Sequence, residues 1–223
     1  LEPRLGDGVD LAGELHPDQR ERLIMPVLWG GGRDPAEELQ RVLLPVAELS
    51  IDAIRAAYRR AREAQEEARR GLQTLFQENR TEDGINVVLL GRPYTVTDPT
   101  MNKGIPEIIG KLGVRAFYQD MLPQSLPSEE TGRLLESVHW RYAADILLAA
   151  DLVARTPGLY PVFVTSFKCA PDAFCADAFK RIMDAREKPY LILQLDEHDS
   201  TVGYETRIEA AVRAFTNHHQ EGE

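Results

Sequence analysis

A lysine and a cysteine, two residue types that can do chemistry, stand side by side between an apolar segment and a helix start. Residues 161–167, PVFVTSF, are apolar and β-branched, which is typical of a buried strand. Pro171 favours a helix that begins directly after them, because proline is tolerated at the first helical position. The turn between strand and helix holds Lys168 and Cys169. Such a turn lies at the carboxyl end of a parallel sheet, beside the free N–H groups of the helix.

Cys169 has two interpretations. A thiolate at a helix N-terminus beside Lys168 suits a metal or a cluster, whereas a free cysteine is often only a small buried apolar residue. Cys175, the second cysteine of the chain, shares a helical face with Phe179 and Ile182, so we expect it to be buried and to bind nothing. Two cysteines cannot by themselves complete a tetrahedral cysteine site.

Apolar segments that alternate with amphipathic helical patterns predict the scaffold of this turn. We expect four strands, near residues 85–90, 114–118, 161–167 and 189–195. Strands that alternate with helices form a parallel sheet covered on both faces, and right-handed crossovers make it doubly wound. The predicted fold class is therefore α/β, with a Rossmann-like or flavodoxin-like parallel sheet of about four strands, helices on both faces and a long N-terminal helix.

Helical patterns occupy the segments between these strands. A short helix ends near Gly113, another runs from Asp172 to about Arg186, and a last one carries Ile208 and Phe215. We expect one further helix, capped by Ser128, with an apolar face made of Leu135, Val138, Tyr142, Ile146 and Ala149.

Polar residues follow every predicted strand. In chain order they are Arg92 and Tyr94, Asp120, then Lys168, Cys169 and Asp172, and finally Asp196, Glu197, His198 and Asp199. Because the carboxyl ends of parallel strands meet at one edge of an open α/β sheet, where ligands bind, we expect these residues along one edge.

The chemistry of two of these groups stays open. Gly91-Arg92-Pro93-Tyr94 lacks the glycine spacing of a dinucleotide fingerprint and the Gly-Lys-Ser/Thr of a phosphate loop, so the sequence predicts no ATP or NAD site there. Arg92 either holds an anionic ligand or pairs with Asp120 or Asp196. Glu197, His198 and Asp199 are either a metal or acid–base group or a solvated turn with a capping aspartate.

The domain pattern divides the chain into three parts: an irregular segment, residues 1–33, a long helical segment, 34–80, and the α/β domain, 81–223. The helical segment starts at an acidic cap, Asp34, with proline next, and Pro45 predicts a kink or a break inside it. Its second half is either a partner-binding coiled-coil arm or a helix that packs along its own domain.

Composition excludes several function classes. The 223 residues carry a net charge of −10, which argues against nucleic acid as a partner. No apolar run approaches the roughly 20 residues that span a bilayer, so no membrane role is predicted. Two cysteines indicate no disulfide framework, and a reducing cytosol is the simplest compartment. The chain starts at Leu1 rather than at methionine, so we expect it to be part of a longer protein.

Five motifs, in one order over residues 85–215, resemble a known family. They are VLLGRPY at 88–94, MNKGIPE at 101–107, VFVTSFKCAPDAF at 162–174, PYLILQLDEH at 189–198 and TRIEA at 206–210. Together they resemble the large acyl-CoA dehydratase activase-related proteins, also called CoA-substrate-specific enzyme activases. The similar region is the one that follows the ATPase domains, which is similar in turn to the subunits of 2-hydroxyacyl-CoA dehydratases.

This resemblance implies an iron–sulfur, ATP-dependent electron-transfer system in which Cys169 is one ligand of a [4Fe-4S] cluster. It implies that Arg92, Tyr94, Lys168, Glu197 and His198 line the cluster or substrate cleft. Ala170 stands where the family has glycine, and the other cluster cysteines of the family lie upstream of the part found here. We therefore expect no cluster in this chain alone, and its sequence lacks the ATP-binding motifs.

The partners that the resemblance implies are the ATPase domains of the same protein and a dehydratase-like iron–sulfur protein, with a homodimer left open. The alternative function is a non-catalytic scaffold or docking module with the same fold. Whether the full protein is an enzyme, and on which substrate, stays open at this point.

Overall fold

Two compact units, residues 1–67 and 68–223, make up the chain. The computed structural model describes residues 34–44, 47–166, 170–195 and 201–222. The predicted site residues Lys168, Cys169, Glu197 and His198 lie outside the described residues, whereas Arg92 and Tyr94 lie within them.

In the first unit, helix α3 (Pro35–Leu43) begins at the acidic cap that the sequence predicts. The Asp34 carboxylate accepts a hydrogen bond from the backbone N–H of Ala36 at 2.9 Å, which satisfies one of the free donors of the helix start. Arg55 of helix α4 (Ile51–Asn79) donates to the same carboxylate, with 2.8 Å between Nη2 and Oδ2. One aspartate thus joins the first turns of both helices.

The predicted long helical segment is divided between α3 and α4. Helix α3 ends at Leu43, and residues 47–50 are not helical. Helix α4 then starts with the Ser50 hydroxyl accepting a hydrogen bond from the N–H of Ala53 at 3.2 Å. Pro45, to which the sequence analysis attributes a kink or a break, lies outside the described residues.

The second unit is built on a parallel sheet of four strands in the order β2-β1-β3-β4. The strands are β1 (Asn86–Leu90), β2 (Arg115–Tyr118), β3 (Leu159–Thr165) and β4 (Leu191–Gln194). Each of the three strand pairs is parallel, with Val88 of β1 opposite Phe117 of β2 and Pro161 of β3. The predicted α/β fold class is confirmed.

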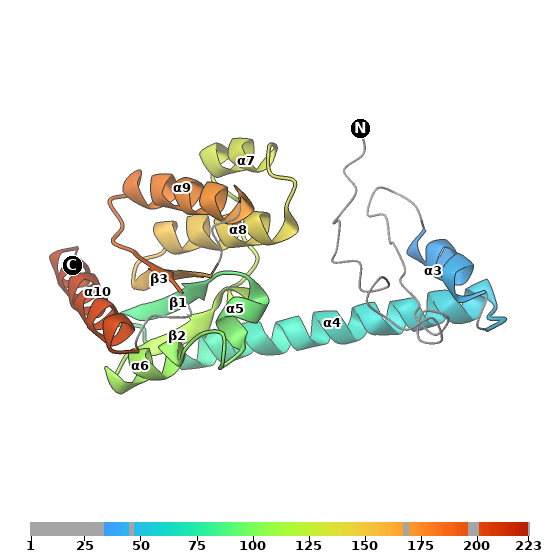
Figure 1. Cartoon of the computed structure of the whole chain (residues 1–223), viewed down its shortest axis with the longest axis horizontal. Helices are drawn as coiled ribbons and strands as arrows, with labels where there is room; N and C mark the ends of the chain where they lie inside the picture. The colour runs from blue at the N-terminus through green and yellow to red at the C-terminus, as the bar shows by residue number, and fades with distance from the viewer. Residues whose placement is uncertain (1–33, 45–46, 167–169, 196–200, 223) are drawn as a thin grey trace. The chain divides into compact units, whose positions relative to one another are not determined.

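Helices follow the strands and cover both faces of the sheet (Figure 1). Their bounds are α5 (Pro93–Thr97), α6 (Ile105–Lys111), the 3₁₀ helix η1 (Gln119–Met121), α7 (Glu129–Leu135), α8 (Arg141–Arg155), α9 (Ala170–Asp184) and α10 (Thr201–Glu221). Helices α7, α8 and α9 lie on one side of the sheet, and α6 and α10 lie on the other (Figure 1).

Two apolar clusters, one for each face of the sheet, form the core. Val88 and Leu90 of β1 belong to the cluster that includes α8 and α9, whereas Val87 and Leu89 belong to the one that includes α6 and α10. Neighbouring side chains of a strand point to opposite faces, so the central strand β1 is buried throughout and is apolar after Asn86.

The helix predicted after Ser128 is in fact two helices, α7 and α8. Ser128 caps α7 as expected, accepting a hydrogen bond from the N–H of Thr131. Helix α7 ends because Ser137 directs both its N–H and its hydroxyl to the Leu134 carbonyl, which competes with continuation of the helix. Tyr142, predicted on the apolar face, is 49% exposed at the start of α8, so that assignment is wrong.

A tight turn precedes α6 and accounts for the motif at residues 101–107. Asn102 is buried, donates to the Val96 carbonyl at 3.0 Å and accepts from the N–H of Gly104 at 2.9 Å. Lys103 and Gly104 adopt left-handed backbone conformations, with φ of 54° and 74°. These contacts give the motif a structural role in holding the turn.

Candidate functional site

The best-placed candidate site lies at the carboxyl edge of the sheet, between β1 and β3. The chain leaves β1 toward β2 on one side, while β3 and β4 lie on the other side, so the strand order reverses between β1 and β3. In open α/β sheets, ligands bind outside the carboxyl ends of the strands at such a reversal. The residues that end these two strands, Leu90 and Thr165, therefore mark the site.

Gly91, directly after β1, lets the two strand ends approach one another. A Cβ atom at this position would lie 2.5 Å from the carbonyl oxygen of Val164 in β3 and 2.8 Å from Cγ1 of Val96. No side chain fits there without a shift of the backbone. The N–H of Gly91 also donates to Oε1 of Gln119 at 3.0 Å, which links the ends of β1 and β2.

Arg92 crosses this edge to the first turn of α9. Its Nε donates to Oδ1 of Asp172 at 2.9 Å, Nη2 reaches the same oxygen, and Nη1 donates to the Tyr94 hydroxyl at 2.8 Å. The other carboxylate oxygen, Oδ2, accepts from the Thr165 hydroxyl at 3.1 Å. Asp172 is only 8% exposed. Its buried carboxylate therefore links the start of α9 by hydrogen bonds to the end of β3 and to the loop after β1.

The charge of Arg92 is fixed by this environment. Burial lowers the pKa of its guanidinium, but the hydrogen bonds to Tyr94 and Asp172 and the charge of Asp172 outweigh burial and raise the pKa. The acidic partner of Arg92 is Asp172. The sequence pattern had indicated Asp120 or Asp196 as its partner. Asp196 lies outside the described residues.

The structure brings Arg92, Tyr94 and Asp172 together, whereas four predicted site residues, Lys168, Cys169, Glu197 and His198, lie outside the described residues. Lys168 and Cys169 fall in the chain between Ser166 and Ala170, the described residues on either side of 167–169. Glu197 and His198 follow Leu195, after β4. Their predicted roles therefore stay predictions.

Ser166 and Asp172 are candidate site residues that sequence reasoning missed or undervalued. The hydroxyl oxygen of Ser166 is buried, and it has no hydrogen-bond partner among the residues that the structure describes. Unpaired buried polar atoms are uncommon in folded proteins and require an explanation. The one available signal was position, since Ser166 directly follows β3 and Asp172 lies in the first turn of α9.

Cys175 is a core residue, as predicted. It is 1% exposed and belongs to the apolar cluster that contains Phe179, with Ile182 packed against that cluster. Burial, and then the nearby charge of Asp172, raise the pKa of the Cys175 thiol to about 12. A thiol in this state is a poor nucleophile and a poor metal ligand, because both roles need the thiolate.

The described residues do not fit a complete iron–sulfur cluster. A [4Fe-4S] cluster is held by four thiolates, whereas the chain has two cysteines, of which Cys175 is a buried neutral thiol. Among residues 34–44, 47–166, 170–195 and 201–222, no three His, Cys, Asp or Glu side chains form a group that could hold a metal ion. We therefore derive no chemical step through a cluster.

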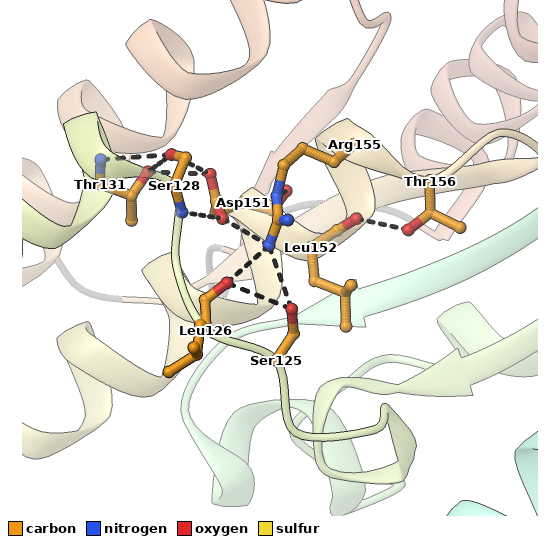
Figure 2. A network of polar contacts seen from close by, with 8 residues as sticks. All are labelled: Ser125, Leu126, Ser128, Thr131, Asp151, Leu152, Arg155 and Thr156. Carbon is orange, nitrogen blue, oxygen red and sulfur yellow. Dashed lines mark hydrogen bonds and ion pairs between the residues drawn. The ribbon is translucent and has the colours of Figure 1, made fainter.

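A second polar network surrounds Asp151 of α8 and is structural (Figure 2). The carboxylate accepts hydrogen bonds from the N–H and hydroxyl of Ser128, at 3.0 and 2.6 Å, and from the Thr131 hydroxyl at 3.0 Å. Arg155 lies 2.9 Å from Oδ2 and also donates to the Leu126 carbonyl. Every oxygen of this buried carboxylate is occupied, so it anchors α7 and the loop before it.

Comparison with known proteins finds a family to which part of the chain is similar. Residues 18–122 match the model of the family described as CoA enzyme activase uncharacterised domain (DUF2229). The activase match covers α3, α4, β1, α5, α6 and β2, and it ends directly after η1. It confirms the resemblance to CoA enzyme activase-related proteins that the motifs indicate.

Two further comparisons, with curated proteins and with solved structures, found no similar protein. Within the described part of the chain, no helix combines the length and the apolar character needed to cross a membrane.

Proposed function

We propose that this chain is part of an activase-related protein that serves an iron–sulfur, ATP-dependent electron-transfer system, acting on or resembling 2-hydroxyacyl-CoA dehydratases. The observation that carries the proposal is the match of residues 18–122 to the CoA enzyme activase domain. Electron transfer is the finer part of the proposal and is supported by the motif resemblance over residues 85–215.

The carboxyl edge of the sheet supports the position of the proposed site. The Arg92–Asp172 pair and the Thr165 hydroxyl connect the described residues on both sides of residues 167–169, among which is Cys169. Cys169 would be one ligand of a [4Fe-4S] cluster whose other ligands come from outside this chain. Lys168, Tyr94, Arg92, Glu197 and His198 would line the same cleft.

The proposed partners follow from the same reasoning. The ATPase domains of the parent protein would supply the coupling to ATP, and a dehydratase-like iron–sulfur protein would exchange electrons with it. The net charge of −10 on the whole chain argues against nucleic acid as a partner. The reducing cytosol remains the proposed compartment.

Iron content and the visible spectrum of the full-length parent protein, purified without oxygen, test this proposal. We expect iron–sulfur absorption in the unmodified protein and a clear loss of iron in Cys169→Ser. Cys175→Ala is the matched control, because Cys175 lies in the apolar core and should leave the iron content unchanged. ATP-dependent reduction of an electron acceptor should fall together with the iron.

Two results would decide against the proposal. A colourless, iron-free parent protein would favour the non-catalytic scaffold or docking module. A Cys169→Ser parent that keeps its iron and its activity would remove Cys169 from the ligand set. In the present chain the same substitution should leave the melting temperature nearly unchanged, since serine differs from cysteine by a single atom and we propose no cluster there.

A further inference from the structure

One side of the middle of helix α4 is exposed to solvent. The helix has 29 residues and is continuous from the first compact unit into the second (Figure 1). Residues that lie three, four or seven positions apart share one side of a helix. On one such side every residue of the middle turns is exposed, and we call this side the α4 face: Ala57, Arg60, Ala61, Ala64, Glu67, Ala68 and Gly71. A Cβ atom at Gly71 would meet no atom within 4 Å, so the face is open there as well.

The α4 face has the residue pattern of a helix that packs against another helix. Its small residues, from Ala57 to Gly71, alternate at spacings of four and three, which is the spacing of the inner positions of a coiled coil. Arg60 and Glu67 border these inner positions on the same flank, at equivalent places in successive heptads. In a coiled coil, charges at such flanking positions select the partner and its orientation.

Arg60 and Glu67 form no ion pair among the residues that the structure describes. Seven residues of helix separate them by about 10 Å along the axis. Side chains of one helix pair at spacings of three or four residues, so Arg60 and Glu67 do not pair with each other. Both charges are therefore available to a partner from outside the helix.

The conservative explanation is an exposed helix that only connects two units. Alanine favours a helix at any position, and opposite charges four residues apart, such as those of Arg59 and Glu63, do so as well. This explanation accounts for the alanines and for the charges on the outer side. It does not account for opposite charges of Arg60 and Glu67 that border one exposed side at a spacing of seven.

We propose that the α4 face is an interface with a second copy of this chain, in which the two α4 helices pack antiparallel. The register that places inner positions opposite one another sets Ala61 beside Ala64 of the partner subunit, and Ala57 beside Ala68 of the partner subunit. In this register, Arg60 of each copy lies beside Glu67 of the partner subunit. The two-fold symmetry forms this ion pair twice.

The charges favour a second copy of the chain in the antiparallel orientation. A two-fold interface requires a face that is complementary to itself, and the α4 face carries one positive and one negative flanking charge. In a parallel pair, Arg60 would lie beside Gln65 and Glu67 beside Leu72, which gives no ion pair. The parallel orientation would also set the basic residues 55–62 of the two copies side by side.

The interface is small, so the proposed dimer depends on protein concentration. Alanine side chains let two helices approach closely but bury little apolar surface each. Flanking ion pairs at a solvent-exposed rim contribute orientation more than affinity. The proposal concerns a contact between copies, and it does not depend on the proposed electron transfer.

Analytical ultracentrifugation of the whole chain over a wide range of concentrations tests the proposal. We expect the mass to rise from that of a monomer to that of a dimer. Arg60→Glu and Glu67→Arg should each raise the dissociation constant at least about tenfold, because both ion pairs become like-charged contacts. Arg59→Glu and Glu63→Arg are the matched controls, since they reverse the same charges on the outer side of α4 and should leave the dimer nearly unchanged.

A mixture of the two reversed variants gives the decisive result. Arg60→Glu and Glu67→Arg should associate with each other at the strength of the unmodified chain, because each supplies the charges that the other lacks. Circular dichroism should show equal helix content in all variants, which separates lost association from lost folding. A chain that stays monomeric, a dimer that is insensitive to both reversals, or reversed variants that fail to associate when mixed would each overturn the proposal.

Discussion

Arg92 and Asp172, eighty residues apart in the sequence, form one hydrogen-bonded ion pair with 2.9 Å between Nε and Oδ1. The pair connects the loop after β1 to the first turn of α9, at the point where the strand order reverses. Because Thr165 donates to the same carboxylate, the pair also includes the end of β3. The carboxyl edge of the sheet is therefore held together by side chains as well as by the strands.

Arg92→Met should lower the free energy of unfolding by about 3 kcal/mol, because it leaves the buried Asp172 carboxylate without its cation. Urea unfolding followed by circular dichroism measures the change. Arg141→Met is the matched control, since Arg141 forms a largely exposed pair with Asp145 and should cost less than about 1 kcal/mol. Equal losses in both variants would mean that the Arg92 pair contributes no more than a surface pair.

Gly91→Ala should destabilise the chain by about 1–3 kcal/mol, since the new methyl group would overlap the Val164 carbonyl. Gly110→Ala in α6 is the control. No atom lies within 4 Å of a Cβ at that position, so alanine should stabilise the helix by up to about 1 kcal/mol. Thermal unfolding of the two variants should shift in opposite directions, and a neutral Gly91→Ala would contradict the close approach of β1 and β3.

Asp151 should contribute stability that depends on pH. Burial raises the pKa of its carboxyl, but hydrogen bonds from Ser128 and Thr131 and the charge of Arg155 outweigh it and lower the pKa below 3.8. Its contribution is therefore complete above about pH 4 and is lost as the pH falls through the folded-state pKa.

Asp151→Asn should cost about 2 kcal/mol at pH 7, since an amide group would face two donors of Ser128. The difference between the unmodified chain and this variant should shrink below pH 4, as measured by urea unfolding. Asp145→Asn, at an exposed position, is the control and should show a much smaller difference at pH 7. A constant difference from pH 7 to pH 2 would show that the charge of Asp151 is irrelevant.

Lys188 should also make stability rise with pH, but in the alkaline range. Its folded-state pKa of about 8 lies below the ordinary 10.5, so the unfolded chain binds the proton more strongly between these values. Stability from this group therefore rises with pH from about 8 to 10.5 and is lost as the pH falls through 8. Lys188→Met should remove this rise, and Lys180→Met should keep it. An unchanged slope in Lys188→Met, followed by urea unfolding across this range, would place the rise elsewhere.

Cys175 should resist alkylation in the folded chain. Its pKa of about 12 leaves almost no thiolate at pH 8, and the side chain is 1% exposed. Iodoacetamide followed by peptide mass spectrometry should find Cys175 unmodified until urea unfolds the chain. Labelling of Cys175 in the folded protein at the rate of the unfolded one would contradict its position in the core.

The sheet was predictable because local patterns determine it. Each predicted strand overlaps an observed one, since continuous apolar runs such as residues 87–90 leave few alternatives to a buried strand. The break between α7 and α8 was not predicted, because the apolar spacing continues across it. There the Ser137 hydroxyl, a single local hydrogen bond, decides the end of the helix.

The sequence alone could not show which side chains pair with one another across the sheet. The choice of Asp172 over Asp120 as the partner of Arg92 cannot come from strand order alone, because β2 and β3 both pair with β1 and each is followed by an acidic residue. Lys188 gave no signal at all, because its surroundings come from α8, β3 and α10, which are distant in the chain. The sequence shows which residue type stands at each of these positions, but it does not show which residues pack against it in the fold.

The pairing of β1 with β3 has a consequence for where this protein can be cut. The family match ends at residue 122, yet β1 pairs on one side with β3, which begins at Leu159. A recombinant product limited to the matched residues would present β1, which is apolar after Asn86, as an open edge strand. Such edges pair with other chains and aggregate. A productive truncation that retains β1 has to extend beyond Thr165, so the boundary that defines the family is not a boundary of folding.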